Sequence, residues 1–415
     1  MTVSFASGII KLTLCRNSLP PACTVMSRNS KSGFTLTSAF HECSPRDAIS
    51  QFARAEGHST GLLFGNMSER RSLATRVIQA VLALPDPIID RLIGAPPVAL
   101  DGRVLNRRLQ AMIVLSERLG IRADGEQGSV AERRVEMRRA TALAMPVRTG
   151  LHVVDRRVPG PAGEIPIRIY RRFGLPESAP AIVYLHGGGW VTGDLDTHDA
   201  SCRLLADESE CIVVAVDYRL APEHPFPAAI DDAVAAYRWV HDHVTELSIE
   251  PGRVGVMGDS AGANLAAVIA QVTRDTDVPA PVAQCLVYPA TDAYLREASH
   301  QIFATGFFLT RESMEWFRSK YLPDPSDWDS PLASPIEQKD LAGVAPALIV
   351  TAGFDPLRDE GRRYAELLVE AGVPTRYRCY DDMVHGFFGM GILPGGMAMA
   401  TEICLGMGDL MHDTP

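Results

Sequence analysis

The sequence has no apolar run approaching the roughly 20 residues that a membrane span needs, and it has no excess of basic residues. It carries 40 Lys and Arg against 50 Asp and Glu, which gives a net charge of −10. A nucleic-acid partner requires a basic face or stripe, so this balance argues against one. The lack of a long apolar run likewise predicts that no segment crosses a membrane.

The eight cysteines form no C-x-x-C pair and show no metal-ligand spacing with histidine. The sequence therefore gives no support for a metal-binding or dithiol redox motif, and we expect neither a metal nor a cofactor. Scattered cysteines of this kind are typical of reduced, mostly buried thiols in an intracellular protein. A cytoplasmic location is the resulting expectation.

Residues 1–41 contain no Asp or Glu and are rich in Ser and Thr. Lys11 interrupts the only stretch that could serve as the apolar core of a secretory signal, which argues against such a signal. The composition fits a transit peptide, or a true start of translation near Met26 or Met67. We predict that residues 1–66 form a poorly ordered leader, because they lack the periodic apolar pattern that would bury surface.

Regular patterning begins at Met67. Residues 67–150 contain helical stretches at 70–84, 104–120 and 130–144, after which the pattern changes to short β-type runs separated by helices. The eight predicted strands span 151–158, 164–171, 181–185, 211–217, 254–257, 283–288, 347–352 and 375–380. Strands that alternate with helices predict a largely parallel sheet covered on both faces, in one α/β domain over 151–415.

The stretch VGVMGDSAGANLAA, residues 254–267, places a serine between two glycines where a strand must become a helix. Its core, Gly258 to Gly262, fits the pattern G-x-S-x-G. In such a turn the Ser260 hydroxyl projects above the sheet, and the flanking glycines avoid clashes with neighbouring backbone. The helix that begins at Ala261 points its N-terminal N–H groups at that hydroxyl. A serine that merely caps a helix is the alternative, and the pentapeptide alone does not exclude it.

A second strand, 181–185, runs into the sequence HGGGW at 186–190. Three successive glycines leave backbone N–H groups unshielded, so a developing oxyanion can approach them closely. A glycine triplet upstream of a G-x-S-x-G turn is far more specific than a triplet in an isolated turn. His186 is expected to anchor this loop by hydrogen bonding and not to act as a base.

A nucleophilic serine needs a base and an orienting carboxylate, which in this architecture follow it in the order Ser, acid, His. The histidines after Ser260 are His300, His385 and His412. We assign the base to His385, which follows a predicted strand, because His300 lies in a predicted insertion and His412 lies near the C-terminus.

Asp355 is the predicted acid, because it comes directly after an apolar strand and is followed by a turn-fixing proline. The neighbouring carboxylates belong to a helix start or lie too close in sequence to His385; they are Asp359, Glu360, Asp381 and Asp382.

Five motifs now stand in order along the chain: HGGGW (186–190), DYRLAPEHPFPA (217–228), GDSAG (258–262), DPLRDEG (355–361) and HGF (385–387). Together they resemble the hormone-sensitive-lipase family of α/β-hydrolases, over about residues 70–410. The resemblance implies an α/β-hydrolase fold, with an eight-stranded, mostly parallel sheet and a helical cap. The cap is expected to combine helices of residues 70–130 with an insertion at 293–335, so that the N-terminal helices of 67–150 are largely cap.

The resemblance also carries over the family's functional residues. Its nucleophile, acid and base fall on Ser260, Asp355 and His385, and its oxyanion hole falls on the N–H groups of Gly188, Gly189 and Ala261. Supporting, structural roles are expected for Asp259, Asp217, Arg219 and Glu223. The insertion is rich in large apolar residues, of which most should form a local core and one or two should line the acyl pocket: Phe303, Phe307, Phe308, Met314, Trp316, Phe317 and Tyr321.

The implied activity is hydrolysis of small-molecule carboxylic esters with short- to medium-chain acyl groups, through a Ser-His-Asp triad and an acyl-enzyme. Two alternatives stay open. The same triad serves amidases and deacetylases, and the family includes a ligand-binding protein that has lost the histidine. The presence of His385 favours the enzyme. A homodimer is also left open.

Overall fold

The computed structural model describes four strands within residues 2–38, then residue 82 and residues 84–118 and 128–413. The chain divides into two units, Met1–Arg70 and Arg71–Pro415. In the first unit two antiparallel hairpins are described, formed by β1 (Thr2–Ala6), β2 (Ile9–Thr13), β3 (Thr24–Asn29) and β4 (Gly33–Ser38). The rest of the predicted leader, and most of the predicted helix at 70–84, lie outside the described residues, so both stay predictions.

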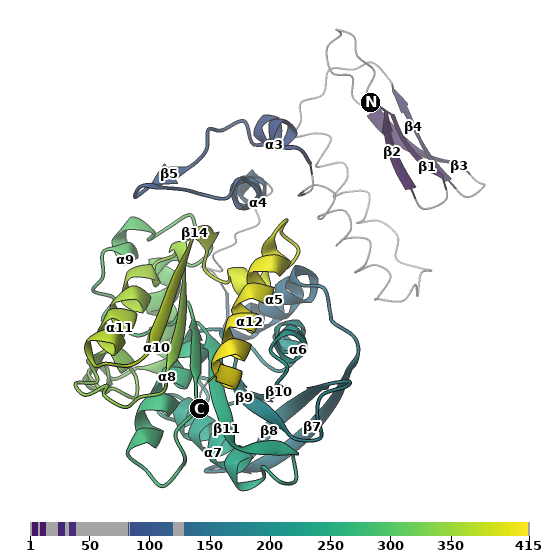
Figure 1. Cartoon of the computed structure of the whole chain (residues 1–415). Helices are drawn as coiled ribbons and strands as arrows, with labels where there is room; N and C mark the ends of the chain where they lie inside the picture. Colours follow the sequence, from purple (N-terminus) through teal and green to yellow (C-terminus); the bar gives the residue numbers. More distant parts are fainter. Residues whose placement is uncertain are drawn as a thin grey trace. The chain divides into compact units, whose positions relative to one another are not determined.

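The second unit is built on an eight-stranded sheet in the order β14-β13-β12-β11-β9-β10-β8-β7 (Figure 1). Only the pairs β7–β8 and β8–β10 are antiparallel. The strands are β7 (Leu151–Gly160), β8 (Gly163–Arg172), β9 (Ala179–Leu185), β10 (Ile212–Val216), β11 (Ile249–Asp259), β12 (Gln284–Val287), β13 (Ala347–Phe354) and β14 (Thr375–Val384). The predicted eight-stranded, mostly parallel sheet is confirmed.

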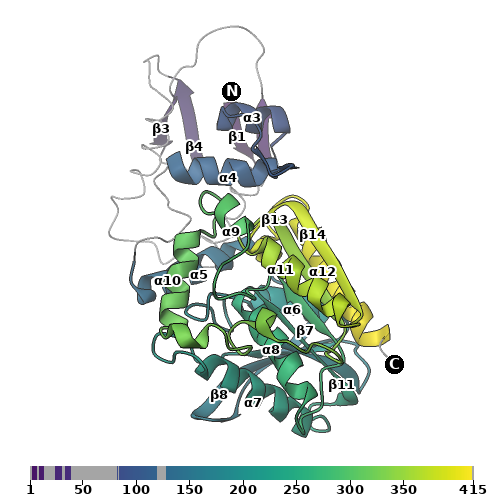
Figure 2. The ribbon, with the colours of Figure 1, turned by 90° about the vertical axis from the view of Figure 1, so that its left-hand side faces the viewer.

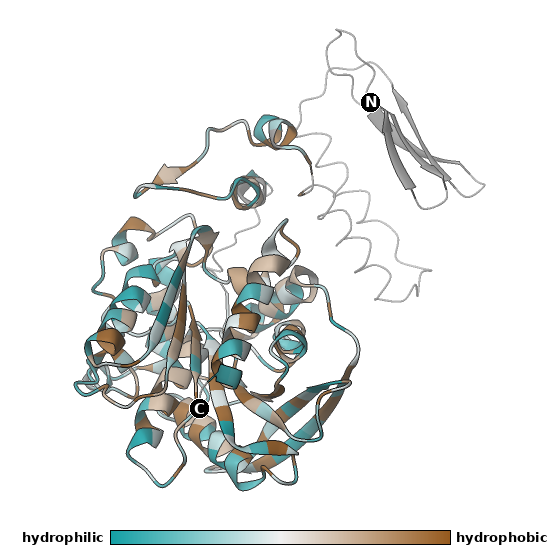
Figure 3. Ribbon diagram, in the orientation of Figure 1, coloured by the Kyte–Doolittle hydropathy of each residue, from teal (hydrophilic) through white to brown (hydrophobic). Residues whose placement is uncertain are grey.

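The central strands are apolar on both faces, because both faces are covered. In β9, Val183 and Leu185 face one core layer, while Ile182 and Tyr184 face the other. This is the alternation of a strand whose side chains point to opposite faces. Figure 3 accordingly shows the middle of the sheet largely in brown, the colour of hydrophobic residues.

Five helices form the two outer layers. One face of the sheet is covered by α7, α8 and α11, and the other by α6 and α12. Their bounds are α6 (Asp199–Glu208), α7 (Ala228–Asp242), α8 (Ala261–Arg274), α11 (Arg358–Glu370) and α12 (Gly396–Asp413).

Residues 84–118 and 128–144 precede the sheet in the chain and form helices and a short two-stranded hairpin. The elements are α3 (Asp86–Ile93), β5 (Ala99–Leu100), β6 (Arg103–Val104), α4 (Arg107–Arg118) and α5 (Val130–Ala144). The predicted helices at 104–120 and 130–144 correspond to α4 and α5. A helix also begins just after Pro85, with Pro87 in its first turn, where a missing N–H costs nothing.

The predicted insertion at 293–335 contains two helices, α9 (Ser299–Ile302) and α10 (Arg311–Tyr321), and a 3-10 turn at Pro325–Asp327. In Figure 2, α10 runs beside α5. The two helices touch where the Arg133 guanidinium lies 3.8 Å from the centre of the Trp316 ring. Helices from distant parts of the sequence therefore meet above the sheet.

Candidate active site

Ser260 lies in a tight turn between β11 and α8. Its φ of 55° and ψ of −118° are values that a residue with a side chain rarely adopts, at a cost of about 1–3 kcal/mol. A Cβ at Gly258 would collide with the backbone of Gly262, and a Cβ at Gly262 would collide with the Leu185 carbonyl. The G-x-S-x-G pattern thus follows from the packing of this turn.

His385 follows β14 and lies between Ser260 and Asp355. Its Nε2 is 3.0 Å from Ser260 Oγ, and its Nδ1 is 2.8 Å from Asp355 Oδ2. Asp355 follows β13, is fully buried, and also accepts the N–H of Leu357 at 2.9 Å. A carboxylate that accepts the Nδ1 proton leaves the Nε2 lone pair facing the serine hydroxyl. The three predicted residues are therefore brought together at the carboxyl ends of β11, β13 and β14.

The rival residues from the sequence have other partners. Asp381 contacts Arg103, Asp382 contacts Asn106, Asp359 contacts Arg358, His412 contacts the Ser209 carbonyl, and His300 contacts Glu360.

The glycine loop after β9 is coiled tightly beside Ser260. Gly188 and Gly189 have φ values of 117° and 61°, respectively, which favour glycine. The N–H of Gly187 is bound to Asp259 Oδ1 at 2.9 Å. Gly188 and Gly189 line the same cavity as Ala261. Ala261 is the first residue of α8, so its N–H has no acceptor within the helix.

Asp259 supports this loop from below. Besides the Gly187 N–H, it accepts the Tyr184 hydroxyl at 2.7 Å, and His198 Nε2 lies 3.5 Å away. Burial raises the pKa of Asp259, but the charge of His198 and these hydrogen bonds outweigh it, so the net pKa lies below its usual value. A buried carboxylate thus holds the loop, the supporting role expected from the sequence.

His186 has no contact with the triad. Its Nδ1 lies 2.8 Å from the Gly187 carbonyl oxygen, and its ring stacks on Tyr218 at 4.3 Å. Burial is the main cause that lowers the pKa of His186 to about 4. It is therefore a neutral anchor of the loop, as expected.

The DYRLAPEHPFPA segment (217–228) connects α5 to the active site through side-chain contacts. Arg134 of α5 bridges to Glu223 at 2.7 Å and donates from Nε to the Val191 carbonyl at 2.8 Å. Arg219 pairs with the buried Asp232 of α7 at 2.8 Å. Arg219 and Glu223 hold neighbouring elements in place, as the sequence led us to expect.

A cavity of about 920 Å³ lies over Ser260 and His385. Its volume is at the upper end of the range for small-molecule sites. Ser260, His385 and the glycine loop form the floor, and the roof is formed by α5 and α10, whose Met137 and Phe317 line it. The cavity is mostly apolar, which suits an acyl chain.

The insertion contributes more to this cavity than expected. Phe308, Met314 and Phe317 line it, where one or two such residues were expected. The others make local contacts: Phe303 and Phe307 pack on Phe354, Trp316 packs on Phe317, and Tyr321 stacks on Trp190. Besides α10, the roof contains α5, which belongs to the helices of 67–150 expected to form most of the cap but begins only at the end of the 70–130 range. Residues 84–118 supply no lining residue.

Tyr288 is a site residue that sequence reasoning missed. Its ring centre lies 4.5 Å from that of His385, and it lines the cavity at the end of β12. Ligand sites in parallel sheets lie at the carboxyl ends of the strands, and that rule could have indicated this position.

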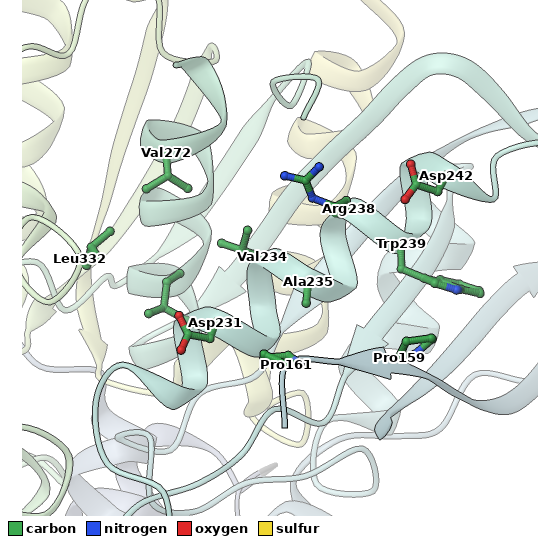
Figure 4. A pocket seen from close by; sticks show the side chains of 11 residues that line it. Pro159, Pro161, Asp231, Val234, Ala235, Arg238, Trp239, Asp242, Val272 and Leu332 are labelled. Atoms are coloured by element: carbon green, nitrogen blue, oxygen red, sulfur yellow. The ribbon is translucent and has the colours of Figure 1, made fainter. Parts of the chain in front are cut away.

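A second hollow, of about 520 Å³, shares no lining residue with the first (Figure 4). It lies between α7 and the β7–β8 turn, where Trp239 and Pro159 face each other. It holds no serine, histidine or cysteine, so nothing in its lining suggests nucleophilic chemistry. In residues 84–118 and 128–413, no group of three or more His, Cys, Asp or Glu is arranged to hold a metal ion.

Comparison with known proteins decides the family. A model of the α/β hydrolase fold matches residues 182–389. The chain belongs to the α/β-hydrolase family. A curated relative, the carboxylic ester hydrolase LipN of Mycobacterium tuberculosis, is 45% identical over 77% of this chain and 86% of its own length. Ethyl acetate hydrolase of Pseudomonas putida is 40% identical over 57% and 77% of the two chains.

Solved structures agree with this α/β-hydrolase assignment. An ester hydrolase from the metagenome of Lake Arreo, complexed with a bipyridine phosphonate derivative, has a TM-score of 0.71 at 39% identity, covering 73% of this chain and 98% of its own. A thermostable esterase from Pseudomonas putida has a TM-score of 0.72 at 33% identity, covering 77% and 99%. The predicted family resemblance is confirmed. Every helix in the described part of this α/β hydrolase is too short or too polar to traverse a bilayer.

Proposed function

We propose that the protein hydrolyses carboxylic esters of small molecules through Ser260, His385 and Asp355. The observation that carries the proposal is the unbroken hydrogen-bonded chain from the Ser260 hydroxyl through His385 to Asp355, at the floor of a largely apolar cavity. The relatives named above are ester hydrolases and esterases, and they confirm the enzyme class predicted from the sequence.

In the first half of the reaction, Ser260 Oγ attacks the ester carbonyl carbon while His385 Nε2 takes its proton. Asp355 holds the imidazole by its Nδ1 hydrogen and stabilises the positive charge that forms. The N–H groups of Gly188, Gly189 and Ala261 bind the oxyanion, and such donors contribute about 3–4 kcal/mol each. His385 then protonates the leaving alcohol.

In the second half, water attacks the acyl-enzyme, with His385 again as the base. The tetrahedral oxyanion returns to the same three N–H groups. Ser260 leaves with the proton from His385, and the carboxylic acid is released. No step needs a metal or a cofactor.

The substrates we propose carry short- to medium-chain acyl groups. Phe317 and Met314 of the insertion line the roof of the cavity, and these large side chains support a limit on the length of an extended chain. An amidase with the same triad stays the second candidate, because the geometry does not choose the leaving group. A purely ligand-binding role is disfavoured, because His385 is in place against both partners.

The test is a fluorophosphonate probe together with p-nitrophenyl esters of rising chain length and matched anilides. We expect labelling of the wild type and turnover of the esters, with the anilides far slower. Ser260→Ala should abolish labelling and lower kcat by about 10⁴-fold or more. Ser313→Ala, at another serine of the cavity lining, is the control and should label normally. Labelling of Ser260→Ala would place the nucleophile elsewhere.

Two finer proposals concern the whole protein. A cytoplasmic location is supported by free, buried cysteines such as Cys202, Cys285 and Cys404, and cell fractionation tests it. A homodimer is supported by the terminal position of β14 in the sheet, where Tyr377 is an exposed side chain of that strand, because an edge strand offers unpaired backbone groups. Light scattering of the purified protein tests the dimer.

A further inference from the structure

A buried pair of ionisable side chains lies beside the cavity and takes no part in the chemistry above. Glu360, in the first turn of α11, and His300, in α9, have no exposed side-chain surface, and Glu360 Oε2 lies 2.7 Å from His300 Nε2. Burying two ionisable groups is unfavourable unless they are paired and their other polar atoms are satisfied. What those other atoms bind therefore indicates what the pair holds in place.

The remaining polar atoms bind backbone groups of other segments. Glu360 Oε1 accepts the N–H groups of Thr291 and Asp292, and His300 Nδ1 lies 3.1 Å from the Glu297 carbonyl oxygen. A carbonyl only accepts, so Nδ1 carries a proton while Nε2 faces the carboxylate. Burial lowers the pKa of His300, but the hydrogen bond and charge of Glu360 raise it by more, so the net pKa lies above its usual value. Burial raises the pKa of Glu360 above its usual value as well. One proton lies in the hydrogen bond between Glu360 Oε2 and His300 Nε2, and all four polar atoms of the pair are engaged.

The segments joined by this pair form the cavity wall and carry the triad acid. Ala290, Asp292 and Ala293 line the cavity, and their segment is held by Glu360 through the two N–H groups. Glu360 lines the cavity itself and belongs to the helix that starts from the Asp355 turn. A shift of either segment would therefore be transmitted to the other.

Ser299 fastens α9 to the same turn. Its hydroxyl donates to the Pro356 carbonyl at 2.5 Å and accepts the N–H of Asp359 at 3.2 Å. Its own N–H donates to the Asp359 carboxylate at 3.1 Å. Because α9 belongs to the insertion that also forms the roof, the roof, the wall and the acid turn meet at Ser299, His300 and Glu360.

We propose that Glu360, His300 and Ser299 are positioning residues that fix the wall at 290–293 to the turn carrying Asp355, and so set the acyl-chain preference. The inference rests on the proposed function and deepens it, because it assigns substrate selection to a buried pair that touches no reacting atom. An acyl chain long enough to contact the wall depends on its position. Ala290 is held close to the nucleophile, because its N–H donates to the Ser260 carbonyl oxygen at 3.4 Å. We therefore expect the wall beyond it, at Asp292 and Ala293, to affect a hexanoyl chain more than an acetyl group.

The experiment compares KM and kcat on p-nitrophenyl acetate and p-nitrophenyl hexanoate. Glu360→Met keeps the side-chain length but removes every hydrogen bond, and it should raise KM for hexanoate about tenfold relative to acetate, with kcat on acetate within about threefold. Glu360→Gln retains an oxygen for the two N–H groups and should restore the KM ratio to within about threefold of wild type. Glu366→Gln, on the exposed face of the same helix, is the matched control and should change neither value.

Ser299→Ala removes a single hydroxyl and decides the matter if Glu360→Met does not fold. It should raise the ratio of the KM for hexanoate to the KM for acetate by about threefold. An unchanged ratio in folded Glu360→Met or in Ser299→Ala, or an equal loss on both esters, would overturn the positioning role. Absence of any ester hydrolysis by the wild type would instead overturn the proposed function.

Discussion

At the residue scale, the loop after β9 requires glycine at position 188 for two reasons, its positive φ and the lack of room for a Cβ. Gly188 has a φ of 117°, and a Cβ there would collide with the backbone carbonyl of Thr192. A backbone atom cannot move aside as a flexible side chain can. At Gly189 the obstacle is different, because a Cβ would meet the ring of Phe317.

Gly188→Ala should therefore displace an oxyanion donor. We expect kcat to fall by about 10²-fold or more with little change in KM, because the lost interaction exists mainly in the transition state. The control is Gly343→Ala, since Gly343 has a φ of 75° but is exposed and remote from the cavity. It should cost stability without lowering kcat. Steady-state kinetics on one ester, with melting curves for both variants, separate the two effects, and a normal kcat in Gly188→Ala would exclude its N–H as a donor.

The acid can be tested by comparing two aspartates near His385. Asp355→Asn removes the carboxylate that accepts the Nδ1 hydrogen, and we expect kcat to fall by about 10³–10⁴-fold. Asp382→Asn should stay within about threefold of wild type, because its carboxylate contacts Asn106 and not the imidazole. Rates with p-nitrophenyl butyrate measure both. A crippled Asp382→Asn beside an active Asp355→Asn would reverse the assignment.

At the scale of elements, local pattern was a good guide where burial alone decides the structure. The runs 181–185 and 347–352 are apolar throughout because β9 and β13 are buried on both faces. The roof could not be located this way. The position of α5 depends on the Arg134–Glu223 bridge and on the stacking of Arg133 on Trp316, contacts between residues far apart in the sequence.

The site divides in the same manner. Ser260 and the glycine loop belong to short motifs whose backbone conformation is determined by the residues of the motif itself. Their chemistry could therefore be predicted from the sequence. Tyr288 and His300 have no such motif, and their relation to the triad exists only after β12, the insertion and α11 have packed together. The sequence places His300 in an insertion, which argues against a role as base, and it predicts an ordinary helix-start acid at its buried partner Glu360. Only the structure brings the two together.

The roof predicts an effect on acyl-chain length. Phe317 of α10 lines the cavity and lies against Gly189, so Phe317→Ala should enlarge the space above the oxyanion loop. We expect the ratio of kcat/KM for octanoate over butyrate to rise about three- to tenfold. Phe307→Ala is the control, because Phe307 packs on Phe354 outside the cavity. Phe307→Ala should lower the melting temperature and leave the octanoate-to-butyrate ratio unchanged. Equal ratios in the two variants would show that Phe317 does not limit the acyl pocket.

At the scale of the whole molecule, two groups near the glycine loop make opposite contributions to stability in acid. The pKa of His186 is lowered from 6.5 to about 4, chiefly by burial, so the folded state binds fewer protons between these values. Its contribution is complete above pH 6.5 and is lost as the pH falls toward 4. Burial raises the pKa of Asp217 from 3.8 to about 6. Its contribution is present in acid and is lost as the pH rises through 6.

Single variants should separate these contributions. Acidification from pH 7.5 to 5 removes about 2 kcal/mol through His186 and restores about 1 kcal/mol through Asp217. His186→Asn should therefore lose less stability than wild type over this interval, and Asp217→Asn should lose more. Urea unfolding at the two pH values gives the differences. If the free energy of unfolding changed by the same amount between the two pH values in all three proteins, neither group would change its protonation on folding.

The last prediction concerns residues 1–66. All predicted catalytic residues, and every residue that lines the cavity, belong to the unit Arg71–Pro415. A chain that starts at Met67 should keep kcat and melting temperature close to those of the full-length protein.

A chain that starts near residue 126 should behave differently, because it lacks α3, the β5–β6 hairpin and α4. It would lose the pairs Arg103–Asp381 and Asp101–Arg358, which bind these elements to β14 and α11, so we expect a lower melting temperature and poorer solubility. Its chain-length preference should nevertheless survive, because the roof helix α5 begins only at Val130. Butyrate and octanoate esters measure the preference in both shortened proteins. Loss of activity on removing residues 1–66 alone would make that segment an ordered part of the enzyme and contradict its assignment as a leader.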